Sequence, residues 1–586
     1  MTVSETIKKQ IGEALTKLGL LEVPAPSEVE VELAKDMAHG DYASNVALIL
    51  GKQLGKDPKE LAEQICKEIG SDAQGYIERC EVAGAGFINF WLSEKFYADT
   101  LKDALGENPT SPRLRGARFG WASELRGKKV MIEFSQANPF KQLHIGHFVG
   151  TVLGECYARL HEASGASVLR ANYQGDVGVH VACSLYGMRE MRETLPNEGA
   201  ELTEKTEFLG KAYAFGAKQY KESPDIKSEI DEINKKLYQK SDQELNELYE
   251  MGKRWSLAHF DTIYKRLGTR FDHLFFESEM APKGLEVIAA HREVFEDSEG
   301  AVVFHAEKYG LHTRVFISSA GLPVYEAKEL GLNKHKFDVA PLDLSIVDTG
   351  NEINDYFKVL MKVMELTIPE VAKRTKHVSH GMLRLSTGKM SSRTGNVITG
   401  ESVMNDAVAN LPPSEISLED KDVIAIGAIK YSILKQAPGR DIIFDMEKSL
   451  SLEGDSGPYI QYAYTRAQSV LLKAQAPKFK VQTNPNLQNL NDSEKKLMRL
   501  IGRFPEIVNE AQKLLAPQVV CTYLIELAGE FHHFYATTRI ADPSTELGAG
   551  ANVGEIRTRR LALTAALAQT IQNGLWILGI GTVDKM

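Results

Sequence analysis

Apolar residues recur every three or four positions in the C-terminal part of the chain, from about Asp422 onward. This period places apolar side chains on one face of a helix. Five such stretches follow one another, covering residues 421–434, 459–474, 494–515, 518–540 and 557–579. The pattern predicts an all-α C-terminal helical bundle.

A different pattern begins at Lys128. Residues 128–134 form the short apolar run typical of a buried strand, the stretch after Gly146 has helical spacing, and residues 166–176 again resemble a strand. A strand, a turn, a helix and a second strand in this order predict a βαβ unit. The fold class that we expect is therefore α/β, with a doubly wound, Rossmann-like parallel sheet.

A long charged segment interrupts this α/β pattern. Residues 185–270 are rich in Lys, Glu and Asp at helical spacing, which predicts a solvated helical insertion. Beyond it, the apolar runs 301–306, 314–318 and 342–350 are expected to be further strands of the same parallel sheet.

The first hundred residues mix helical and strand-like spacing and predict a small α+β domain. A turn-rich stretch, residues 106–116, reads as a linker. The expected domain order is an N-terminal domain at 1–106, a Rossmann-like domain at 127–385, a connecting domain at 386–450 and a helical domain at 451–586.

Length and charge narrow the functional classes. A chain of 586 residues is too long to fold around a single hydrophobic core, so we expect several domains. The net charge of −10 argues against a protein that coats nucleic acid non-specifically. No apolar run approaches the length that spans a bilayer. The N-terminus mixes acids with its lysines and lacks the apolar centre of a signal peptide, so we expect a cytoplasmic protein without a membrane partner.

The chain has five cysteines without a CxxC or a paired Cys/His spacing. They are Cys66, Cys80, Cys156, Cys183 and Cys521. We expect small buried apolar side chains, and neither a disulfide framework nor a structural zinc site.

The turn between the first strand and its helix is rich in polar residues. In EFSQANPFKQLHIGHFVGT, residues 133–151, the histidines His144 and His147 stand at the start of the helix. The free N–H groups and positive dipole end of a helix N-terminus suit a phosphate, and Gly146 lets a ligand approach the backbone. Two histidines at this spacing could also bind a metal, but no third ligand accompanies them. The pattern favours nucleotide binding.

A second polar cluster, STGKMSSRTGN at residues 386–396, surrounds Lys389 with hydroxyl residues and glycines. This composition is typical of a mobile loop that closes on anionic oxygens. The cluster is a weak signal alone and gains its value from the first motif.

Together, HIGH and KMSSR resemble the two signature motifs of class I aminoacyl-tRNA synthetases. VMIEFSQANPFKQLHIGH, LPVYEAKELG and HGMLRLSTGKMSSRTGN are similar to segments of the arginyl-tRNA synthetase family. HGDYASNVAL and GAGFINFWL resemble its additional N-terminal domain, which binds tRNA, and LAGEFHHFYATTR resembles its anticodon-binding domain. The resemblance covers nearly the full length of the chain.

The resemblance implies an arginine–tRNA ligase. Such an enzyme activates L-arginine with ATP to arginyl-adenylate and pyrophosphate, then transfers arginine to the 2′-OH of the terminal adenosine of tRNA(Arg). ATP would arrive with Mg²⁺, no structural metal is implied, and catalysis would rest on positioning and electrostatics. The implied catalytic residues are Lys141, His144, His147 and Lys389. The implied ATP contacts are His144, Gly146, His147, Lys389, Met390, Ser391, Ser392 and Arg393.

The same resemblance implies an arginine pocket. Glu329, four residues after Tyr325, can share one helical face with it, and both would meet the guanidinium. Glu329 stands where the family usually has Asp. Buried carboxylates reject neutral analogues, so no editing domain is required. The full expected arginine-binding set is Glu133, Ser135, Asn138, His144, Tyr325, Glu329 and Glu352.

In the C-terminal helices, Phe531, Tyr535 and Arg539 are candidates for contacts with unpaired tRNA bases. Family habit favours a monomer. Three positions depart from the family: Ser392 with Arg393 replaces a second signature lysine, Ile353 stands where a glutamine is frequent, and His180 stands where a glutamine is common.

Three alternatives stay open: a class I synthetase of cysteinyl or glutamyl type, a non-catalytic synthetase-derived tRNA-binding protein, and a small-molecule nucleotidyltransferase. The intact histidines and Lys389 argue against a non-catalytic protein, and the flanking domains argue against the nucleotidyltransferase.

Overall fold

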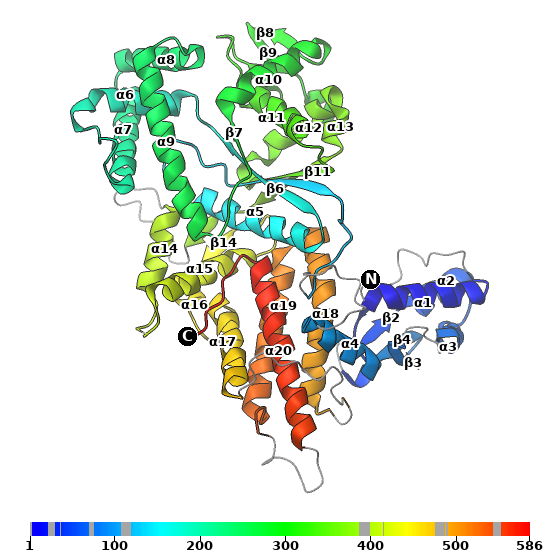
Figure 1. Ribbon diagram of the computed structural model, residues 1–586. Coiled ribbons are helices and arrows are strands. Elements are labelled where there is room, and N and C mark those ends of the chain that lie inside the picture. The colour runs from blue at the N-terminus through cyan, green and yellow to red at the C-terminus, as the bar shows by residue number, and fades with distance from the viewer. Residues whose placement is uncertain are drawn as a thin grey trace.

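The chain folds around a central parallel sheet, with helices above it and a helical bundle below it (Figure 1). The computed structural model describes residues 3–20, 30–34, 37–69, 75–106, 119–385, 399–413, 415–474, 487, 490–542 and 553–586.

Five strands form the central sheet in the order β12-β11-β5-β6-β7, and every neighbouring pair is parallel. They are β5 (Lys129–Glu133), β6 (Ser167–Gln174), β7 (His273–Phe276), β11 (Leu344–Gly350) and β12 (Thr375–His380). After β5, the chain adds β6 and β7 on one side of this strand and then β11 and β12 on its other side. This reversal opens a crevice at the carboxyl ends of β5 and its neighbours, which is where doubly wound folds bind ligands. The predicted fold class is confirmed.

Helices cover both faces of the sheet. They are α5 (Ile145–Ala163), α10 (Glu277–Ala290), α11 (Tyr325–Val339), α12 (Asn354–Thr367) and α13 (Pro369–Ala372), whereas α6 (Val179–Glu190) packs against the helical insertion. Helix α5 lies between the sheet and the C-terminal helices, and 14 of its 19 residues are buried. The helix that carries the HIGH motif is therefore fixed on both sides.

Helices α10 and α11 touch backbone to backbone. A methyl group added at Gly284 would lie 1.9 Å from the carbonyl oxygen of Ala327, and one added at Gly331 would lie 2.4 Å from the Gly284 nitrogen. Only glycine permits this approach. The contact brings the first turns of two helices, which carry Glu277 and Tyr325, to the same edge of the sheet.

Two of the expected sheet strands lie elsewhere. Strands β8 (Glu296–Ser298), β9 (Ala301–Phe304) and β10 (Arg314–Ile317) form a separate antiparallel sheet. The expectation that 301–306 and 314–318 join the parallel sheet is wrong, because a short connection pairs these runs with each other. Strands β7 and β12 fill the remaining places in the parallel sheet.

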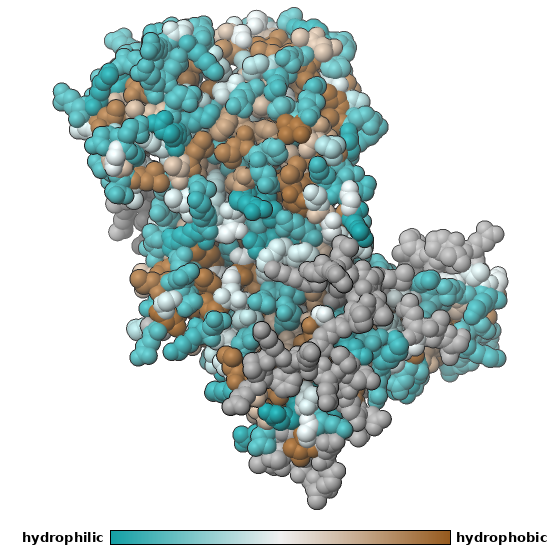
Figure 2. Space-filling view, viewed as in Figure 1, coloured by the Kyte–Doolittle hydropathy of each residue, from teal (hydrophilic) through white to brown (hydrophobic). Residues whose placement is uncertain are grey.

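The charged interruption is helical, as its spacing predicts. Its helices are α7 (Leu202–Glu222), α8 (Pro224–Gln239) and α9 (Gln243–Arg266). With α6 they enclose a core of their own and form the upper left part of Figure 1. Hydrophilic side chains cover most of this part in the face that Figure 2 shows.

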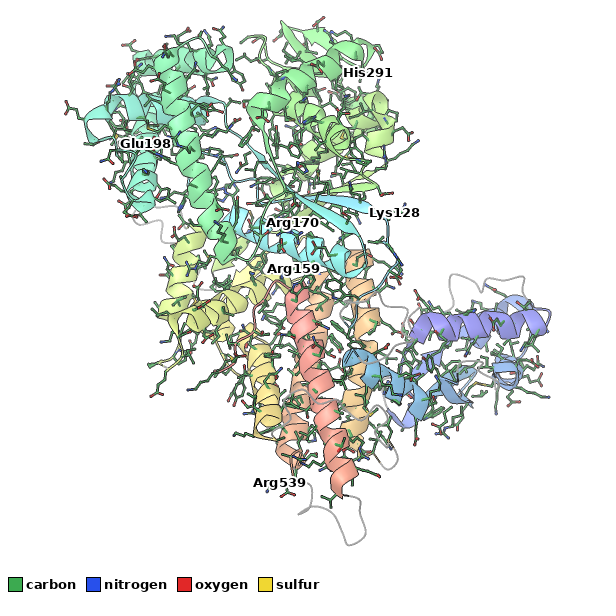
Figure 3. All side chains as sticks on the ribbon, viewed as in Figure 1. Lys128, Arg159, Arg170, Glu198, His291 and Arg539 are labelled. Atoms are coloured by element: carbon green, nitrogen blue, oxygen red, sulfur yellow. A yellow bond between two sulfur atoms is a disulfide. The ribbon has the colours of Figure 1, made fainter. Side chains whose placement is uncertain are left out.

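The predicted C-terminal helices are confirmed. This part comprises β13 (Leu383–Leu385), β14 (Ile442–Phe444), α14 (Gly400–Ala409), α15 (Leu418–Leu434), α16 (Met446–Ser449), α17 (Gly457–Lys473), α18 (Asp492–Leu514), α19 (Pro517–Thr537) and α20 (Val553–Ile577). Arg159 of α5 joins the bundle to the domain of the parallel sheet (Figure 3). Its guanidinium donates to the carbonyls of Trp576, at 2.9 Å, and Gly268, at 2.8 Å.

The N-terminal domain projects sideways from the bundle (Figure 1). It contains α1 (Val3–Lys17), α2 (Val46–Leu54), α3 (Pro58–Ile69) and α4 (Glu94–Ala104), with the strands β1 (Val31–Leu33), β2 (Tyr42–Ser44), β3 (Ile77–Ala83) and β4 (Phe87–Leu92). Glu506 of α18 helps to anchor it: its carboxylate accepts from the Ser4 N–H at 2.7 Å and from the Tyr42 hydroxyl at 3.0 Å.

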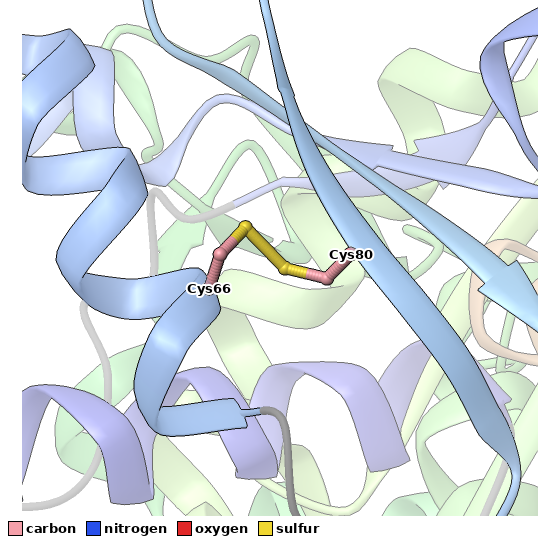
Figure 4. The surroundings of a disulfide bond; sticks show 2 residues. All are labelled: Cys66 and Cys80. Carbon is pink, nitrogen blue, oxygen red and sulfur yellow. A yellow bond between two sulfur atoms is a disulfide. The ribbon is translucent and has the colours of Figure 1, made fainter.

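A disulfide joins Cys66 of α3 to Cys80 of β3, with the Cα atoms 5.6 Å apart (Figure 4). The expectation that both are unpaired apolar residues is wrong, because α3 packs against β3 and brings the two thiols together. The remaining three cysteines are free and buried, as expected. No described helix has the length and apolarity needed to cross a membrane, and no three described His, Cys, Asp or Glu residues form a metal-binding group.

The disulfide closes a loop across a sequence separation of 14 residues. Because a cross-link of this length lowers the entropy of the unfolded chain, its removal is expected to cost the N-terminal domain about 3 kcal/mol of unfolding free energy. Urea unfolding of the Cys66→Ser/Cys80→Ser double variant measures this loss. Reductant should destabilise the parent chain equally and leave the double variant unchanged. Equal stability of both chains without reductant would contradict the expectation.

Candidate active site at the carboxyl edge of the parallel sheet

A cavity of about 300 Å³ opens at the point where the strand order reverses. Its wall comes from the turn after β5, the start of α5, the ends of β6, β11 and β12, and the first turns of α10 and α11. The cavity brings together seven of the predicted site residues: Ser135, Asn138, His144, Gly146, His147, Tyr325 and Glu352. Ile353, the departure from the family pattern, also lines it.

The turn after β5 has a strained backbone. Ser135, Gln136 and Phe140 adopt φ values of 76°, 57° and 67°, in the left-handed region that non-glycine residues rarely occupy. Hydrogen bonds hold this conformation: the Gln136 N–H donates to Asn172 Oδ1 at 3.0 Å, and the Phe140 N–H donates to Ser256 Oγ at 2.9 Å. The polar residues of this stretch therefore shape the turn as well as the cavity.

The two signature histidines stack at the start of α5, with ring centroids 3.6 Å apart. His144 caps the helix, because its Nδ1 accepts from the Gly146 N–H at 3.1 Å. A nitrogen that accepts carries no proton, so a neutral His144 bears its proton on Nε2. Burial and the neighbouring Lys141 lower the pKa of His144. Burial lowers the pKa of His147 further, to about 3, with His144 and Lys141 adding to the effect.

Asn138 and Glu277 meet beside the backbone of Gly175. Asn138 Oδ1 accepts from the Gly175 N–H at 2.8 Å, which leaves the two N–H donors of its side chain. Glu277, at the start of α10, lines the cavity and pairs with Lys328 at 2.7 Å. Burial raises the pKa of Glu277, and Lys328 opposes that shift. Glu277 has no motif of its own, but its place directly after a parallel strand could have revealed it.

The predicted carboxylates Glu133 and Glu329 are fully buried behind the cavity wall, beside Tyr325. Glu133 forms an ion pair with Lys336, which is also fully buried. Burial and the nearby charge of Glu133 raise the pKa of Glu329 to about 8, while Lys336 and Tyr325 act in the opposite direction. The buried hydroxyl groups of Tyr173 and Tyr356 have no hydrogen-bond partner among the described atoms. These hydroxyl oxygens can accept hydrogen bonds from a cationic group that binds here.

Asp348 and His380 face the start of α5 from the ends of β11 and β12. His380 Nδ1 lies 3.1 Å from Asp348 Oδ1, and both residues line the cavity opposite Gly150. Asp348 raises the pKa of His380 despite its burial. These residues were not among the predicted site residues. Both stand at carboxyl ends of parallel strands, where doubly wound folds bind ligands, and this position in the chain could have revealed them.

The remaining catalytic candidates are placed differently. Lys141 lies outside the cavity wall, with its Nζ 5.5 Å from the ring of Tyr213 on α7. The second signature residues, Lys389, Met390, Ser391, Ser392 and Arg393, lie outside the described residues. The chain directly after them returns to the first motif: Thr399 forms an antiparallel bridge with His144, and the Gly400 N–H donates to the Leu143 carbonyl at 3.0 Å.

Of the three candidate tRNA contacts, one lies in the core and two lie at the surface. Phe531 is fully buried in the core of the helical domain, so the expectation that its ring contacts tRNA is wrong. Tyr535 is 42% exposed on α19, and the guanidinium of Arg466 lies 4.8 Å from its ring centroid. Arg539 is exposed at the lower end of the bundle (Figure 3).

Comparison with known families covers the chain in three parts. The family model described as "tRNA synthetases class I (R), catalytic domain" matches residues 118–446. "Arginyl tRNA synthetase N terminal domain" matches residues 5–92, and "DALR anticodon binding domain" matches residues 460–586. The chain belongs to the arginyl-tRNA synthetase family.

Relatives agree with this membership along the full length. An arginine–tRNA ligase of Clostridium acetobutylicum is 30% identical over 594 residues, which cover 99% of this chain and 100% of that protein. The arginyl-tRNA synthetase of Thermus thermophilus has a TM-score of 0.79 at 25% identity, and that of Plasmodium falciparum has 0.78 at 19%; each match covers 100% of both chains. The cysteinyl, glutamyl and non-catalytic alternatives are not favoured.

The arginyl-tRNA synthetase site is expected to hold neutral histidines. Since the folded pKa of His147 is about 3, below its ordinary 6.5, protonation favours the unfolded chain, and stability falls as the pH falls below about 6.5. NMR of ¹³C-histidine-labelled protein should show a neutral imidazole for His147 down to pH 4.5. A His147→Gln variant assigns the resonance. Titration of that resonance near pH 6.5 would contradict the buried neutral state.

Proposed function

We propose that this chain ligates L-arginine to tRNA(Arg), with both steps at the cavity between β5, β6 and β11. The observation that supports this best is the pairing of two groups of residues at one cavity: neutral histidines at a helix start on its wall, and Tyr325 on the same wall with buried carboxylates behind it. The first group suits a triphosphate and the second suits a guanidinium.

In the first step, a carboxylate oxygen of arginine attacks the α-phosphorus of MgATP, and pyrophosphate leaves. Negative charge spreads over phosphoryl oxygens, so fixed N–H donors stabilise the transition state more than water does. His144 offers its Nε2–H because its Nδ1 is occupied by the Gly146 N–H. Because His144 and His147 act as neutral hydrogen-bonding groups, neither has to gain or lose a proton in this step. Lys389 is proposed to contact the phosphates together with Met390, Ser391, Ser392 and Arg393, since Thr399, which follows them in the chain, pairs with His144.

For the amino acid, Tyr325 and Glu329 are proposed to bind the guanidinium, with Glu277 as an additional acceptor. Asn138 offers its two amide N–H donors to the carboxylate, and Ser135 and Glu352 line the remaining wall. Glu133 acts from behind the wall through its charge. In the second step, the 2′-OH of the terminal adenosine attacks the carbonyl carbon of the adenylate, and AMP leaves.

By resemblance to its family, the protein is proposed to act as a monomer in the cytoplasm. The N-terminal domain, the catalytic half and the helical domain are proposed to contact one tRNA together. Aminoacylation of total tRNA with each labelled amino acid tests the function. Arginine alone should become attached, and attachment of another amino acid in its place would overturn the proposal.

Replacing Glu329 with Gln tests the guanidinium site. Loss of one partner of a buried charged contact costs about 2–5 kcal/mol, so KM for arginine should rise about 100-fold in the aminoacylation reaction, with KM for ATP nearly unchanged. Glu326→Gln is the matched control, because Glu326 lies on the same helix and faces Arg314 at 3.8 Å. Equal KM values for arginine in both variants would place the guanidinium elsewhere.

Replacing Tyr535 with Ala tests the tRNA surface. Stacking on one unpaired base is worth about 1–3 kcal/mol, so the Kd for tRNA(Arg) should rise roughly tenfold in a filter-binding assay. His533→Ala serves as control, since His533 is also exposed on α19 but lies on another side of the helix. An unchanged Kd for the Tyr535 variant would remove this face from the tRNA contact.

A further inference from the structure

Lys336 is a buried cation that no motif explains. It stands on α11, is fully buried, and its Nζ pairs with Glu133 at the end of β5. The same Nζ donates to Asn333 Oδ1 at 3.3 Å, and Asn333 Nδ2 donates to Glu329 Oε2 at 3.4 Å. One polar chain therefore runs from Glu133 through Lys336 and Asn333 to Glu329, behind the cavity wall.

The charges of this wall do not balance when every group is ionised. Three carboxylates act on Tyr325, those of Glu329, Glu277 and Glu133. Two ammonium groups face them: Lys336 pairs with Glu133, and Lys328 pairs with Glu277 at 2.7 Å. Glu329 is the carboxylate without a lysine partner of its own. A guanidinium supplies one positive charge, which is the amount that the ionised wall lacks.

We propose that Lys336 is a positioning residue for arginine selection: it pairs with Glu133 and sets the pH at which Glu329, which has no lysine partner of its own, exchanges its proton, so that Glu329 is protonated in the free protein and releases the proton when arginine binds. This rests on the proposed guanidinium site. The O–H bond of the Glu329 carboxyl breaks, its proton passes to the buffer, and the carboxylate pairs with the guanidinium. Without arginine, the charges of these carboxylates and lysines cancel, so the site does not attract small cations. An amino acid with a neutral side chain cannot stabilise the ionised form of Glu329.

The surroundings of Glu329 support this state. Burial and the charge of Glu133 raise its pKa to about 8, and Glu277 acts in the same direction. Lys336 and Tyr325 of its own helix oppose them. The hydroxyls of Tyr173 on β6 and Tyr356 on α12 also face the group. Removal of Lys336 is therefore expected to shift the titration of Glu329 to higher pH.

Proton release can be measured directly. Calorimetric titration of arginine into the full-length chain with tRNA(Arg), at pH 7 in phosphate and in Tris, gives the protons released from the difference in heat. We expect close to one proton to be released per arginine bound. The arginine Kd should fall about tenfold for each unit by which the pH rises between pH 6 and 7.5. The Glu329→Gln variant should release none, and it also corrects for titration of the arginine ammonium group.

Substitutions at position 336 separate positioning from a structural role. Lys336→Met should move the bend in the pH profile of the arginine Kd to higher pH, and Lys336→Arg should move it back. Lys334→Met is the control, since Lys334 is half-exposed on the same helix and pairs with Asp338. The calorimetry of the parent chain decides the proposal even where a variant fails to fold.

The outcomes are distinct. Arginine binding with a flat pH profile and no proton release would overturn the proposal and leave the proposed function intact. Absence of arginine binding at every pH would remove the proposed function itself. A release that persists in Glu329→Gln would assign the proton to another group and also overturn the proposal.

Discussion

The site depends on a backbone constraint in the eleven residues between β5 and α5. The chain must leave a buried parallel strand, reverse through left-handed positions at Ser135 and Gln136, and enter a helix with His144 as its cap. Such a path is unfavourable for side-chain-bearing residues. It persists because neighbouring elements bind it: Asn172 of β6 and Ser256 of α9 accept its N–H groups. The proposed ATP and arginine sites share this turn, so both depend on the same set of hydrogen bonds.

This dependence explains why the helical insertion and the C-terminal bundle belong to the active site without lining it. Helix α9 supplies Ser256 to the turn, and its Tyr249 and Lys253 bind Asp176 at the end of β6. On the opposite side, Arg159 ties α5 to the last helix of the bundle. The turn after β5 is thus held between the helical insertion and the C-terminal bundle. A change far from the cavity that shifts α9 or α5 therefore also shifts this turn.

The sequence predicted the parallel sheet, the terminal helices and seven residues of the cavity wall, because strand–turn–helix order and the HIGH motif are local signals. It misplaced residues 301–306 and 314–318, since strand pairing is decided by the chain that joins them and not by their apolar pattern. It missed Glu277, Asp348 and Lys336, whose roles arise only when separate strand ends and helices meet. Phe531 looked like an RNA-contacting aromatic, and only its packing assigned it to the core. The Cys66–Cys80 pair lacked any recognisable spacing.

The glycine contact between α10 and α11 has a consequence for how this pocket can change over evolution. Because no side chain lies between the two helices at Gly284 and Gly331, their separation cannot be tuned by exchanging larger and smaller apolar residues. Glu277 and Tyr325 are therefore presented at a fixed spacing. A lineage acquiring a different amino-acid specificity would have to replace the lining side chains themselves, since moving the helices apart would first require abandoning both glycines.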